Sequence, residues 1–210
     1  ASTTKGRIYS IKKIDTDATP VKITVSGGGT IDGNTDVQLY LQNDFITAQC
    51  VYDGSAYAWH IIAEYHKPHS ASLKQTSDQS ISTGGSVLLS YDTVEFAHGC
   101  EADTTDNTIT VKRAGRYLVG ANIAMDGFSA FAYIQIDLQK NGTTANAYNR
   151  SRHLAGYNGK PAGNTSMLID LDAGDYMRAF CYHASSSAEN TNSGATQLQN
   201  QMRFFVQEMR

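Results

Sequence analysis

The sequence predicts an all-β protein, with two β-sheets packed face to face in the larger of two units. Three observations support this prediction. The 210 residues include 12 tyrosines, 18 glycines and many serines, threonines and asparagines, a composition that favours strands and turns. Only 18% of the residues are charged, which is below the usual share for a globular domain. Short apolar runs alternate along the chain with a period of two, and glycine or asparagine turns separate them.

The first unit, residues 1–64, is expected to be a small β module. Within residues 21–25, apolar residues alternate with Lys and Thr, which is the pattern of a half-buried strand. Asp53-Gly54 lies between two apolar runs and is a strong signal for a hairpin turn. The expected strands are residues 7–14, 21–25, 37–41, 45–52 and 56–62.

Residues 65–78 are expected to be a linker. This segment is polar, lacks periodicity and contains Pro68. It also carries His66 and His69, which a trimer would gather into a group of imidazoles, although no neighbouring carboxylate or cysteine completes a metal-binding set.

The second unit, residues 79–210, is expected to be a β-sandwich or jelly roll. Residues 184–200 are rich in Ser, Asn and Gly and are expected to form a flexible surface loop. The expected strands are residues 87–91, 94–96, 108–112, 116–125, 131–140, 144–149, 166–171, 176–183 and 202–209.

The strand at residues 116–125 has two uncharged faces beyond its first residue. Strand alternation places on one face an ordinary set of core residues, namely Tyr117, Val119, Ala121, Ile123 and Met125. The other face carries Leu118, Gly120, Asn122 and Ala124. A face this small and uncharged is expected to pack against a second sheet or against another copy of the chain.

Four landmarks of the second unit, in this order, resemble the C1q/TNF-like jelly-roll family. They are Gly115-Arg-Tyr117, Lys140-Asn-Gly142, Leu171-Asp-Ala-Gly-Asp175 and Phe204-Phe-Val206. The last departs from the family, which usually has Phe-x-Gly there. The resemblance implies a ten-stranded jelly roll that assembles as a homotrimer. It further implies a trimer interface that includes Leu118, Gly120 and Phe204.

The first unit is similar to a short β module of bacteriophage virion proteins. The similarity lies in the segments Tyr9-Ser-Ile-Lys-Lys-Ile-Asp15, Val21-Lys-Ile-Thr24, Thr30-Ile-Asp-Gly33 and Asp53-Gly-Ser-Ala-Tyr-Ala-Trp59-His-Ile-Ile62. In those proteins the module precedes a variable distal head. The combination resembles a phage fibre, spike or decoration protein, located in the virion and in contact with other virion proteins.

The sequence contains no recognisable catalytic motif. It has no Gly-x-Ser-x-Gly elbow, no His-Glu-x-x-His helix and no P-loop, so we expect neither an enzyme nor a cofactor. Cys181 and His183 share a strand face and are expected to be a buried thiol and a strand-end imidazole. Asp170, Asp172 and Asp175 offer oxygen ligands to an ion, but backbone amides more often satisfy such turn residues.

One predicted loop, residues 148–157, has the composition of a binding surface. It mixes aromatic and cationic residues that stack on sugars or contact acidic polymers, or else it is a solvated connection. Its candidate binding residues are Tyr148, Arg150, Arg152, His153 and Tyr157.

Net charge and hydropathy exclude some classes of binding partner. A net charge of −3 without a long basic run argues against nucleic acid. No apolar run approaches the roughly 20 residues needed to cross a bilayer, so we expect no membrane insertion. Three widely spaced cysteines favour free thiols over disulfides. We therefore expect a trimeric virion protein that contacts a host-surface glycan or protein; the alternative is a secreted C1q-like carbohydrate- or protein-binding module, which the lack of a recognisable signal peptide disfavours.

Overall fold

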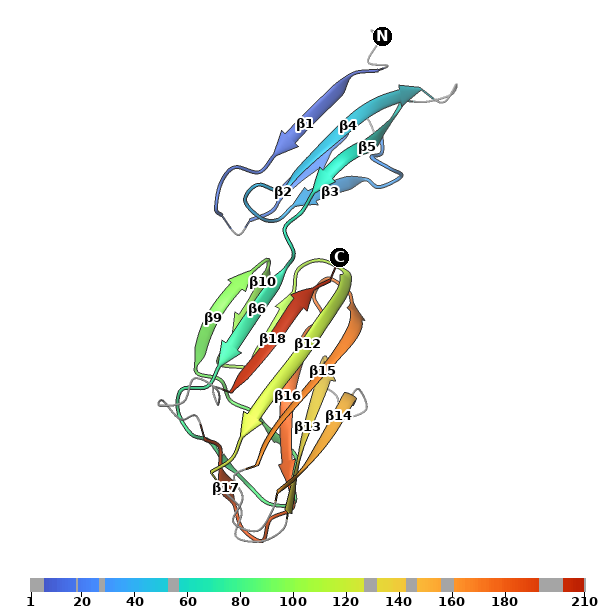
Figure 1. The fold of residues 1–210 in the computed structure, drawn as a ribbon. Coiled ribbons are helices and arrows are strands. Elements are labelled where there is room, and N and C mark those ends of the chain that lie inside the picture. The colour runs from blue at the N-terminus through green and yellow to red at the C-terminus, as the bar shows by residue number, and fades with distance from the viewer. Residues whose placement is uncertain are drawn as a thin grey trace. The chain divides into compact units, whose positions relative to one another are not determined.

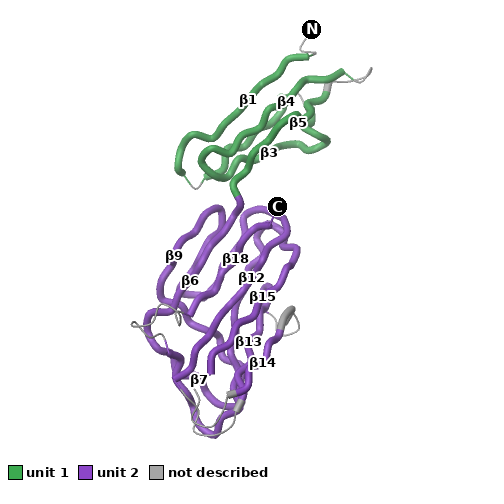
Figure 2. Tube along the Cα trace, in the orientation of Figure 1, with its two compact units in different colours: residues 1–67 green, residues 68–210 purple. Residues whose placement is uncertain are grey.

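The fold of the protein comes from a computed structural model, in which residues 6–17, 19–26, 29–52, 57–126, 132–142, 147–155, 161–192 and 202–209 are described. These residues form strands and turns without a helix, which confirms the predicted all-β class. None of them therefore belongs to a helix that could span a membrane. The chain divides into two compact units, residues 1–67 and 68–210 (Figures 1 and 2).

Unit 1 combines a three-stranded antiparallel sheet with a two-stranded hairpin. The sheet has the order β1-β4-β5, and its strands are Ile8–Lys12, Phe45–Tyr52 and Tyr57–Tyr65. The hairpin pairs β2 (Val21–Thr24) with β3 (Asp36–Leu39). Antiparallel pairing of β4 with β5 confirms the hairpin expected around Asp53-Gly54, although residues 53–56 themselves lie outside the described residues. The buried hydrophobic residues among the described part of unit 1 are Ile31, Leu39, Ile46, Ala48 and Cys50.

Asp44 ties the last residues of unit 1 to its sheet. Its side chain is fully buried, and its carboxylate accepts hydrogen bonds from the backbone N–H groups of Tyr40 (3.1 Å), Leu41 (3.0 Å) and Lys67 (2.8 Å). The imidazole of His66 lies 3.4 Å from the same carboxylate. One buried acid thus satisfies backbone donors both in the turn before β4 and after β5.

Unit 2 is built from two antiparallel sheets. The sheet named here the β12 sheet has the order β15-β12-β18-β6-β9. The second, the β16 sheet, has the order β10-β11-β16-β13-β14, and β8 also pairs with β16. The strands of the β12 sheet are β6 (Ser70–Lys74), β9 (Thr93–His98), β12 (Gly115–Ala124), β15 (Ala162–Leu171) and β18 (Arg203–Glu208). Those of the β16 sheet are β8 (Val87–Leu88), β10 (Cys100–Asp103), β11 (Thr108–Val111), β13 (Ala132–Lys140), β14 (Ala147–Ala155) and β16 (Tyr176–His183).

The chain crosses repeatedly between the two sheets. It runs from β11 in the β16 sheet to β12 in the other, returns to β13 and β14, crosses to β15, returns to β16, and ends in β18 (Figure 1). This alternation between two packed antiparallel sheets is the jelly-roll arrangement that the sequence predicts.

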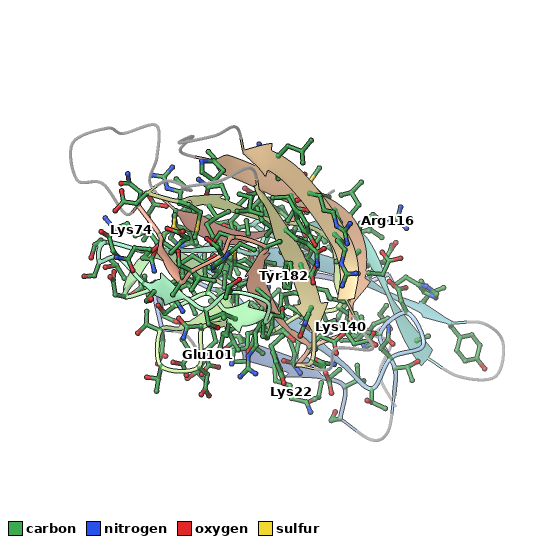
Figure 3. The ribbon with its side chains drawn as sticks, turned by 90° about the horizontal axis from the view of Figure 1, so that it is seen from below. Lys22, Lys74, Glu101, Arg116, Lys140 and Tyr182 are labelled. Atoms are coloured by element: carbon green, nitrogen blue, oxygen red, sulfur yellow. The ribbon has the colours of Figure 1, made fainter. Side chains whose placement is uncertain are left out.

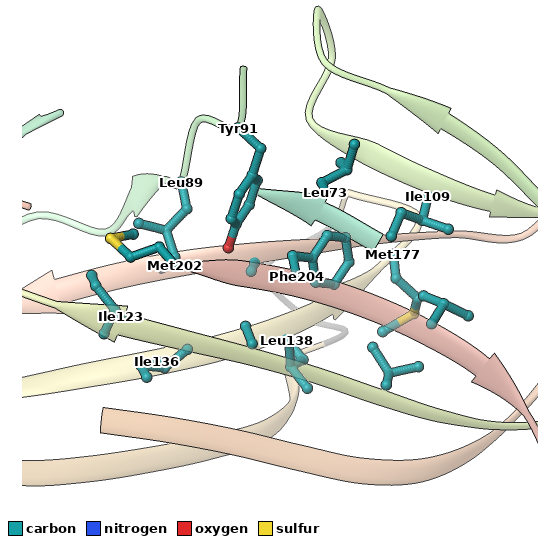
Figure 4. Close-up of a cluster of buried hydrophobic side chains, with 14 of the residues drawn as sticks. Leu73, Leu89, Tyr91, Ile109, Ile123, Ile136, Leu138, Met177, Met202 and Phe204 are labelled. Carbon is teal, nitrogen blue, oxygen red and sulfur yellow. The ribbon is translucent and has the colours of Figure 1, made fainter. Parts of the chain in front are cut away.

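One hydrophobic core fills the space between the two sheets. The predicted core face of β12 is confirmed, because Tyr117, Val119, Ala121, Ile123 and Met125 are each at most 2% exposed. Figure 4 shows part of this cluster, in which Leu73, Tyr91 and Phe204 lie together with residues of both sheets. Truncating a large side chain here is expected to cost about 3–5 kcal/mol, because a close-packed core relaxes only partly around a cavity.

The predicted linker is wrong for residues 70–74. They form β6, which pairs with both β18 and β9 and is therefore an internal strand of the β12 sheet. Ala71 and Leu73 are completely buried in the core. The segment Ser-Ala-Ser-Leu-Lys has only one large apolar residue, so its alternation is hard to recognise, although it faces the core with a period of two.

The predicted loop at residues 184–200 is structured in part. Glu189–Asn190 form β17, which pairs with β7 (Ser80–Ile81) at the end of unit 2 remote from the start of β6 (Figure 1). Residues 193–200 lie outside the described residues.

Candidate functional site

The outer face of the β12 sheet carries a strip of apolar side chains that point away from the core. The register places Phe205 beside Gly120 and Ser72, and Ser72 beside Phe96. On the neighbouring row, Leu118 pairs with Leu168. Phe96 is 40% exposed and Leu168 is 58% exposed, whereas Leu118 and Phe205 are half-buried. We call Phe96, Leu118, Leu168 and Phe205 the apolar strip.

Gly120 allows the ring of Phe205 to lie across β12. A Cβ atom at Gly120 would lie 2.5 Å from the Cζ atom of this ring, closer than real contacts permit. The ring covers the glycine, which is buried for that reason. The small residue on the outer face of β12 therefore makes room for a large one from β18.

Charged pairs border the apolar strip at both ends. Arg116 Nε donates to Asp170 Oδ1 at 3.0 Å, and this pair raises the pKa of Arg116 and lowers that of Asp170. At the other end, Arg203 Nη2 donates to Glu95 at 2.7 Å, and Glu95 also accepts from the Ser72 hydroxyl. An apolar centre with a polar rim is the usual anatomy of a protein–protein interface.

The structure corrects one of the three predicted interface residues. Phe204 is completely buried in the core of its own subunit and stacks on Tyr91, with ring centroids 5.8 Å apart. Successive residues of a strand point to opposite faces, so Phe205 occupies the outer face instead. Leu118 and Gly120 do lie on this face, next to Phe205.

The sequence reasoning also missed Phe96 and Leu168. A signal for Phe205 was present, since Met202, Phe204 and Val206 form an apolar set with a period of two and leave Phe205 on the other side. Phe96 and Leu168 join the strip only through pairing between strands, which no local pattern reveals.

The predicted binding loop is wrong as a loop. Ala147–Ala155 form β14, an edge strand of the β16 sheet that pairs with β13. The backbone of Tyr148 belongs to β14, but its side chain lies outside the described residues, as does the whole of Tyr157. Among the predicted binding residues this leaves Arg150, Arg152 and His153.

Arg150 and Arg152 share the outer face of the β16 sheet with a buried carboxylate and a buried amide. Arg150 donates from Nε to Asp137 Oδ1 (2.9 Å) and from Nη2 to Oδ2 (3.2 Å). The amide nitrogen of Gln135 donates to the same carboxylate at 3.1 Å, and its oxygen accepts from Arg152 Nε at 2.9 Å. Because Asp137 and Gln135 are only 4% and 6% exposed, the two arginine side chains form a cover over a continuous polar chain.

A pair of tyrosines lies beside Arg152. The rings of Tyr133 and Tyr182 stack with centroids 5.7 Å apart, and the guanidinium carbon of Arg152 lies 4.9 Å from the centroid of Tyr133. A hydrogen bond with Tyr133 raises the pKa of Tyr182. Figure 3 labels Tyr182 of β16 together with Arg116, which belongs to the β12 sheet.

His153 does not belong to this face. It points to the opposite side of β14, where its Nε2 lies 3.0 Å from the carbonyl oxygen of Asn164 and its ring packs against Gly163. The alternation that places Arg150 and Arg152 outward turns His153 toward β15. The predicted set of binding residues is thus divided between two sides of the strand.

Most of the residues weighed as ion ligands make other contacts. His66 lies near Asp44 and Glu64, while His69 is buried at the start of β6. Asp170 pairs with Arg116, and Asp175 pairs with Lys140. Within the described ranges, no group of three or more His, Cys, Asp or Glu residues is arranged to hold a metal ion.

Cys181 and His183 are separate structural groups. Both are completely buried, and burial raises the pKa of the Cys181 thiol to about 12, so it is protonated at neutral pH. The Nε2 atom of His183 lies 2.8 Å from the carbonyl oxygen of Ile81, and its Nδ1 atom lies 3.1 Å from the Ser185 hydroxyl. All three cysteines are free.

Comparisons with known proteins give similarity at the level of structure alone. No protein-family model matches the sequence, and no curated protein matches it. Among solved structures, murine APRIL aligns with a TM-score of 0.47 and 13% identity, over 68% of this chain and 100% of APRIL. The globular domain of zebrafish complement 1qA protein aligns with a TM-score of 0.46 and 11% identity, over 68% and 97% of the two chains. Eiger TNF from S. frugiperda gives 0.46 and 13%, over 69% and 94%.

Proposed function

We propose that the protein is a structural component of a bacteriophage virion, a fibre, spike or decoration protein whose second unit forms a homotrimeric head. The observation that carries the assembly is the apolar strip on the outer face of the β12 sheet, with ion pairs at both ends. Side chains such as Leu168, which is 58% exposed, gain stability when a second copy removes them from water. Closed symmetric association satisfies such a face without leaving it open to further copies.

The virion role is supported by unit 1. Its sequence segments resemble the β module that precedes the distal head in phage virion proteins. Ile8, Tyr9 and Ile62 are each about half exposed, and an apolar cavity of about 240 Å³ opens beside Trp59. A small unit with this much exposed apolar surface is suited to attachment to other virion proteins.

In this proposal, the head acts by binding and not by catalysis. The β16 sheet presents Arg152, Tyr133 and Tyr182 on its outer face, where they are available to contact a host-surface glycan or protein. The localisation that follows is the virion surface.

The trimer is tested by light scattering after size exclusion, with three times 22.8 kDa as the expected mass. Leu118→Glu is expected to place a charge within the apolar strip and to yield monomers. Leu154→Glu is the matched control, because Leu154 is 90% exposed on the other sheet and its replacement should leave the mass unchanged. A wild-type monomer, or a Leu118→Glu variant that stays trimeric, contradicts the proposal of a trimer.

The virion role is tested by mass spectrometry of purified phage particles whose genome encodes the chain. If the protein is absent from those particles, the virion role is contradicted.

A further inference from the structure

On the outer face of the β16 sheet, the outer edge of the Arg152 guanidinium has no hydrogen-bond acceptor among the described residues, and two stacked tyrosines lie beside it. We propose that Arg152, Tyr133 and Tyr182 form a subsite for the carboxylated sugar residues of a cell-surface polysaccharide. This rests on the host-surface role proposed above and names the chemistry of the ligand.

Buried neighbours fix the orientation of Arg152. The Asp137 carboxylate can only accept hydrogen bonds, so the Gln135 amide must turn its NH₂ group toward Asp137, at 3.1 Å. Its oxygen then faces the other way, toward Arg152 Nε at 2.9 Å. The second arginine, Arg150, holds Asp137 in place through two parallel hydrogen bonds. A flexible surface side chain is thereby restrained before any ligand arrives, which lowers the entropy cost of binding.

The free part of Arg152 has the geometry of a carboxylate receptor. Only its Nε atom donates to a described residue, so the Nη atoms have no carboxylate partner within the described part of the chain. Two other arginines on the outer faces are instead paired with a carboxylate, Arg150 with Asp137 and Arg116 with Asp170. A guanidinium edge with two parallel N–H groups fits a carboxylate in a bidentate arrangement.

The tyrosines supply a surface for the sugar ring beside this cation. Tyr133 lies against the guanidinium of Arg152, and Tyr182 continues the aromatic surface at 5.7 Å. Their rings offer apolar area and their hydroxyls offer polar contacts, a combination suited to a pyranose ring with an apolar face and polar edges. The exposed side chain of Leu154, paired with Tyr133 on the same face, extends the apolar part.

The net charge of the chain argues that an acidic polymer would bind through a local contact and not through long-range attraction to the whole molecule. The chain carries a net charge of −3, so a polyanion is repelled by the molecule as a whole. Binding of an acidic polysaccharide would therefore depend on this local cation and its aromatic neighbours.

The test measures binding of the intact chain to two polymers, polygalacturonate and polysialic acid, by biolayer interferometry. The two probes distinguish a hexuronate from a nonulosonate, and binding of either one supports the subsite. Methyl-esterified polygalacturonate, which lacks the charge, is expected not to bind. Arg152→Gln is expected to weaken binding at least about tenfold, because it removes a charge-assisted bidentate contact. Arg152→Lys keeps the positive charge but lacks the planar guanidinium, so its affinity should stay close to that of Arg152→Gln and well below that of the wild type.

Two further variants make the result specific. Tyr182→Ala is expected to weaken binding several-fold, and Arg116→Gln on the other sheet is expected to change it less than twofold. All variants should remain folded, which circular dichroism checks. Arg152→Gln is expected to lower the unfolding temperature slightly, because it removes the donor to the buried Gln135 amide. The subsite is refuted if neither polymer binds, if Arg116→Gln weakens binding as much as Arg152→Gln, or if poly-glutamate binds equally well regardless of Tyr182.

The same samples separate this proposal from the assembly proposal. Their mass is measured by light scattering alongside binding. A monomer that binds polymer through Arg152 would contradict the trimer and leave the subsite standing. A trimer that binds neither polymer would remove the subsite and leave the assembly intact.

Discussion

Single residues in this fold show how one polar atom changes the stability of a core. Tyr91 is 1% exposed and its ring stacks on Phe204, but its hydroxyl, which points into the cluster, has no partner among the described residues (Figure 4). Burial raises the pKa of Tyr91 strongly, so the group is neutral at any physiological pH. A buried hydroxyl without a hydrogen-bond partner destabilises the folded state, whereas a ring without the hydroxyl would not have this cost.

Replacing Tyr91 with Phe is therefore expected to stabilise unit 2 by about 1 kcal/mol, since it removes the unsatisfied group and keeps the ring. Tyr117→Phe is the matched control, because the Tyr117 hydroxyl donates to the Arg113 carbonyl oxygen at 2.8 Å and its loss should destabilise by a similar amount. Urea unfolding followed by circular dichroism measures both. Equal destabilisation by the two variants would show that the Tyr91 hydroxyl does have a partner.

Asp44 should make the stability of unit 1 depend on pH. Burial alone would raise its pKa, but hydrogen bonds from the backbone of Leu41 and Lys67 outweigh burial, and the pKa is lowered. A carboxyl whose pKa is lower in the folded state contributes stability that is present above its unfolded pKa, near 4, and is lost as the pH falls through the folded value. Unit 1 is therefore expected to become less stable below about pH 4.

Asp44→Asn tests this link. An amide cannot accept at both oxygen positions, so at pH 7 the variant should lose about 1–3 kcal/mol. It should also show a smaller loss of stability between pH 5 and 3 than the wild type. Asp15, Asp17 and Asp36, whose pKa values are also lowered, should account for the remaining loss. Trp59, the single tryptophan, lies in unit 1, and its fluorescence reports this unfolding. An unchanged acid dependence in the variant would rule out Asp44 as its source.

At the scale of strands, the sequence predicts faces more reliably than it predicts pairing. The Tyr117 face of β12 follows from alternation alone and is buried as expected. Strand β6 was not predicted, because its core positions, Ala71 and Leu73, are separated by serine and give a weak local pattern. Its burial depends on pairing with β9 and β18, which are distant in sequence.

The candidate site was predicted in part for the same reason. Leu118 and Gly120 were placed on the correct face from a local pattern. Their neighbours Phe205 and Phe96 come from other strands, and only the register brings them together. Likewise, Arg150 and Arg152 were identified from the composition of their segment. Their partners Gln135 and Asp137 lie on β13, and nothing in the local sequence marks these two as partners of the arginines.

Gly120 offers a test of this packing between strands. Gly120→Ala is expected to push the Phe205 ring out of place and to destabilise unit 2 by about 1–3 kcal/mol, because the added methyl overlaps the ring. In a Phe205→Ala background the same change should cost much less, giving a coupling energy above about 0.5 kcal/mol in a double-mutant cycle. An equal cost in both backgrounds would instead implicate the Thr165 carbonyl oxygen, which lies 3.2 Å from the added atom.

At the scale of the whole molecule, the two units differ greatly in the cores that hold them together. The described part of unit 1 buries a few hydrophobic side chains, of which Leu39 and Ile46 are fully enclosed. Unit 2 encloses a continuous cluster between two sheets, from Leu73 in β6 to Val206 in β18. Small domains bury a smaller fraction of their surface and are marginally stable, so unit 1 should be the weaker of the two.

Heating the intact chain is therefore expected to give two transitions, with unit 1 unfolding first. Trp59 fluorescence should follow the first transition, and the larger calorimetric peak should follow the second. Leu39→Ala is expected to lower the midpoint temperature of the first transition only, and Ile109→Ala that of the second only. Each variant should reduce the free energy of unfolding of its own unit by about 2–5 kcal/mol. Because each core is enclosed within its own unit, neither variant should affect the other transition. A single transition that both variants shift together would show that the two units unfold as one cooperative body.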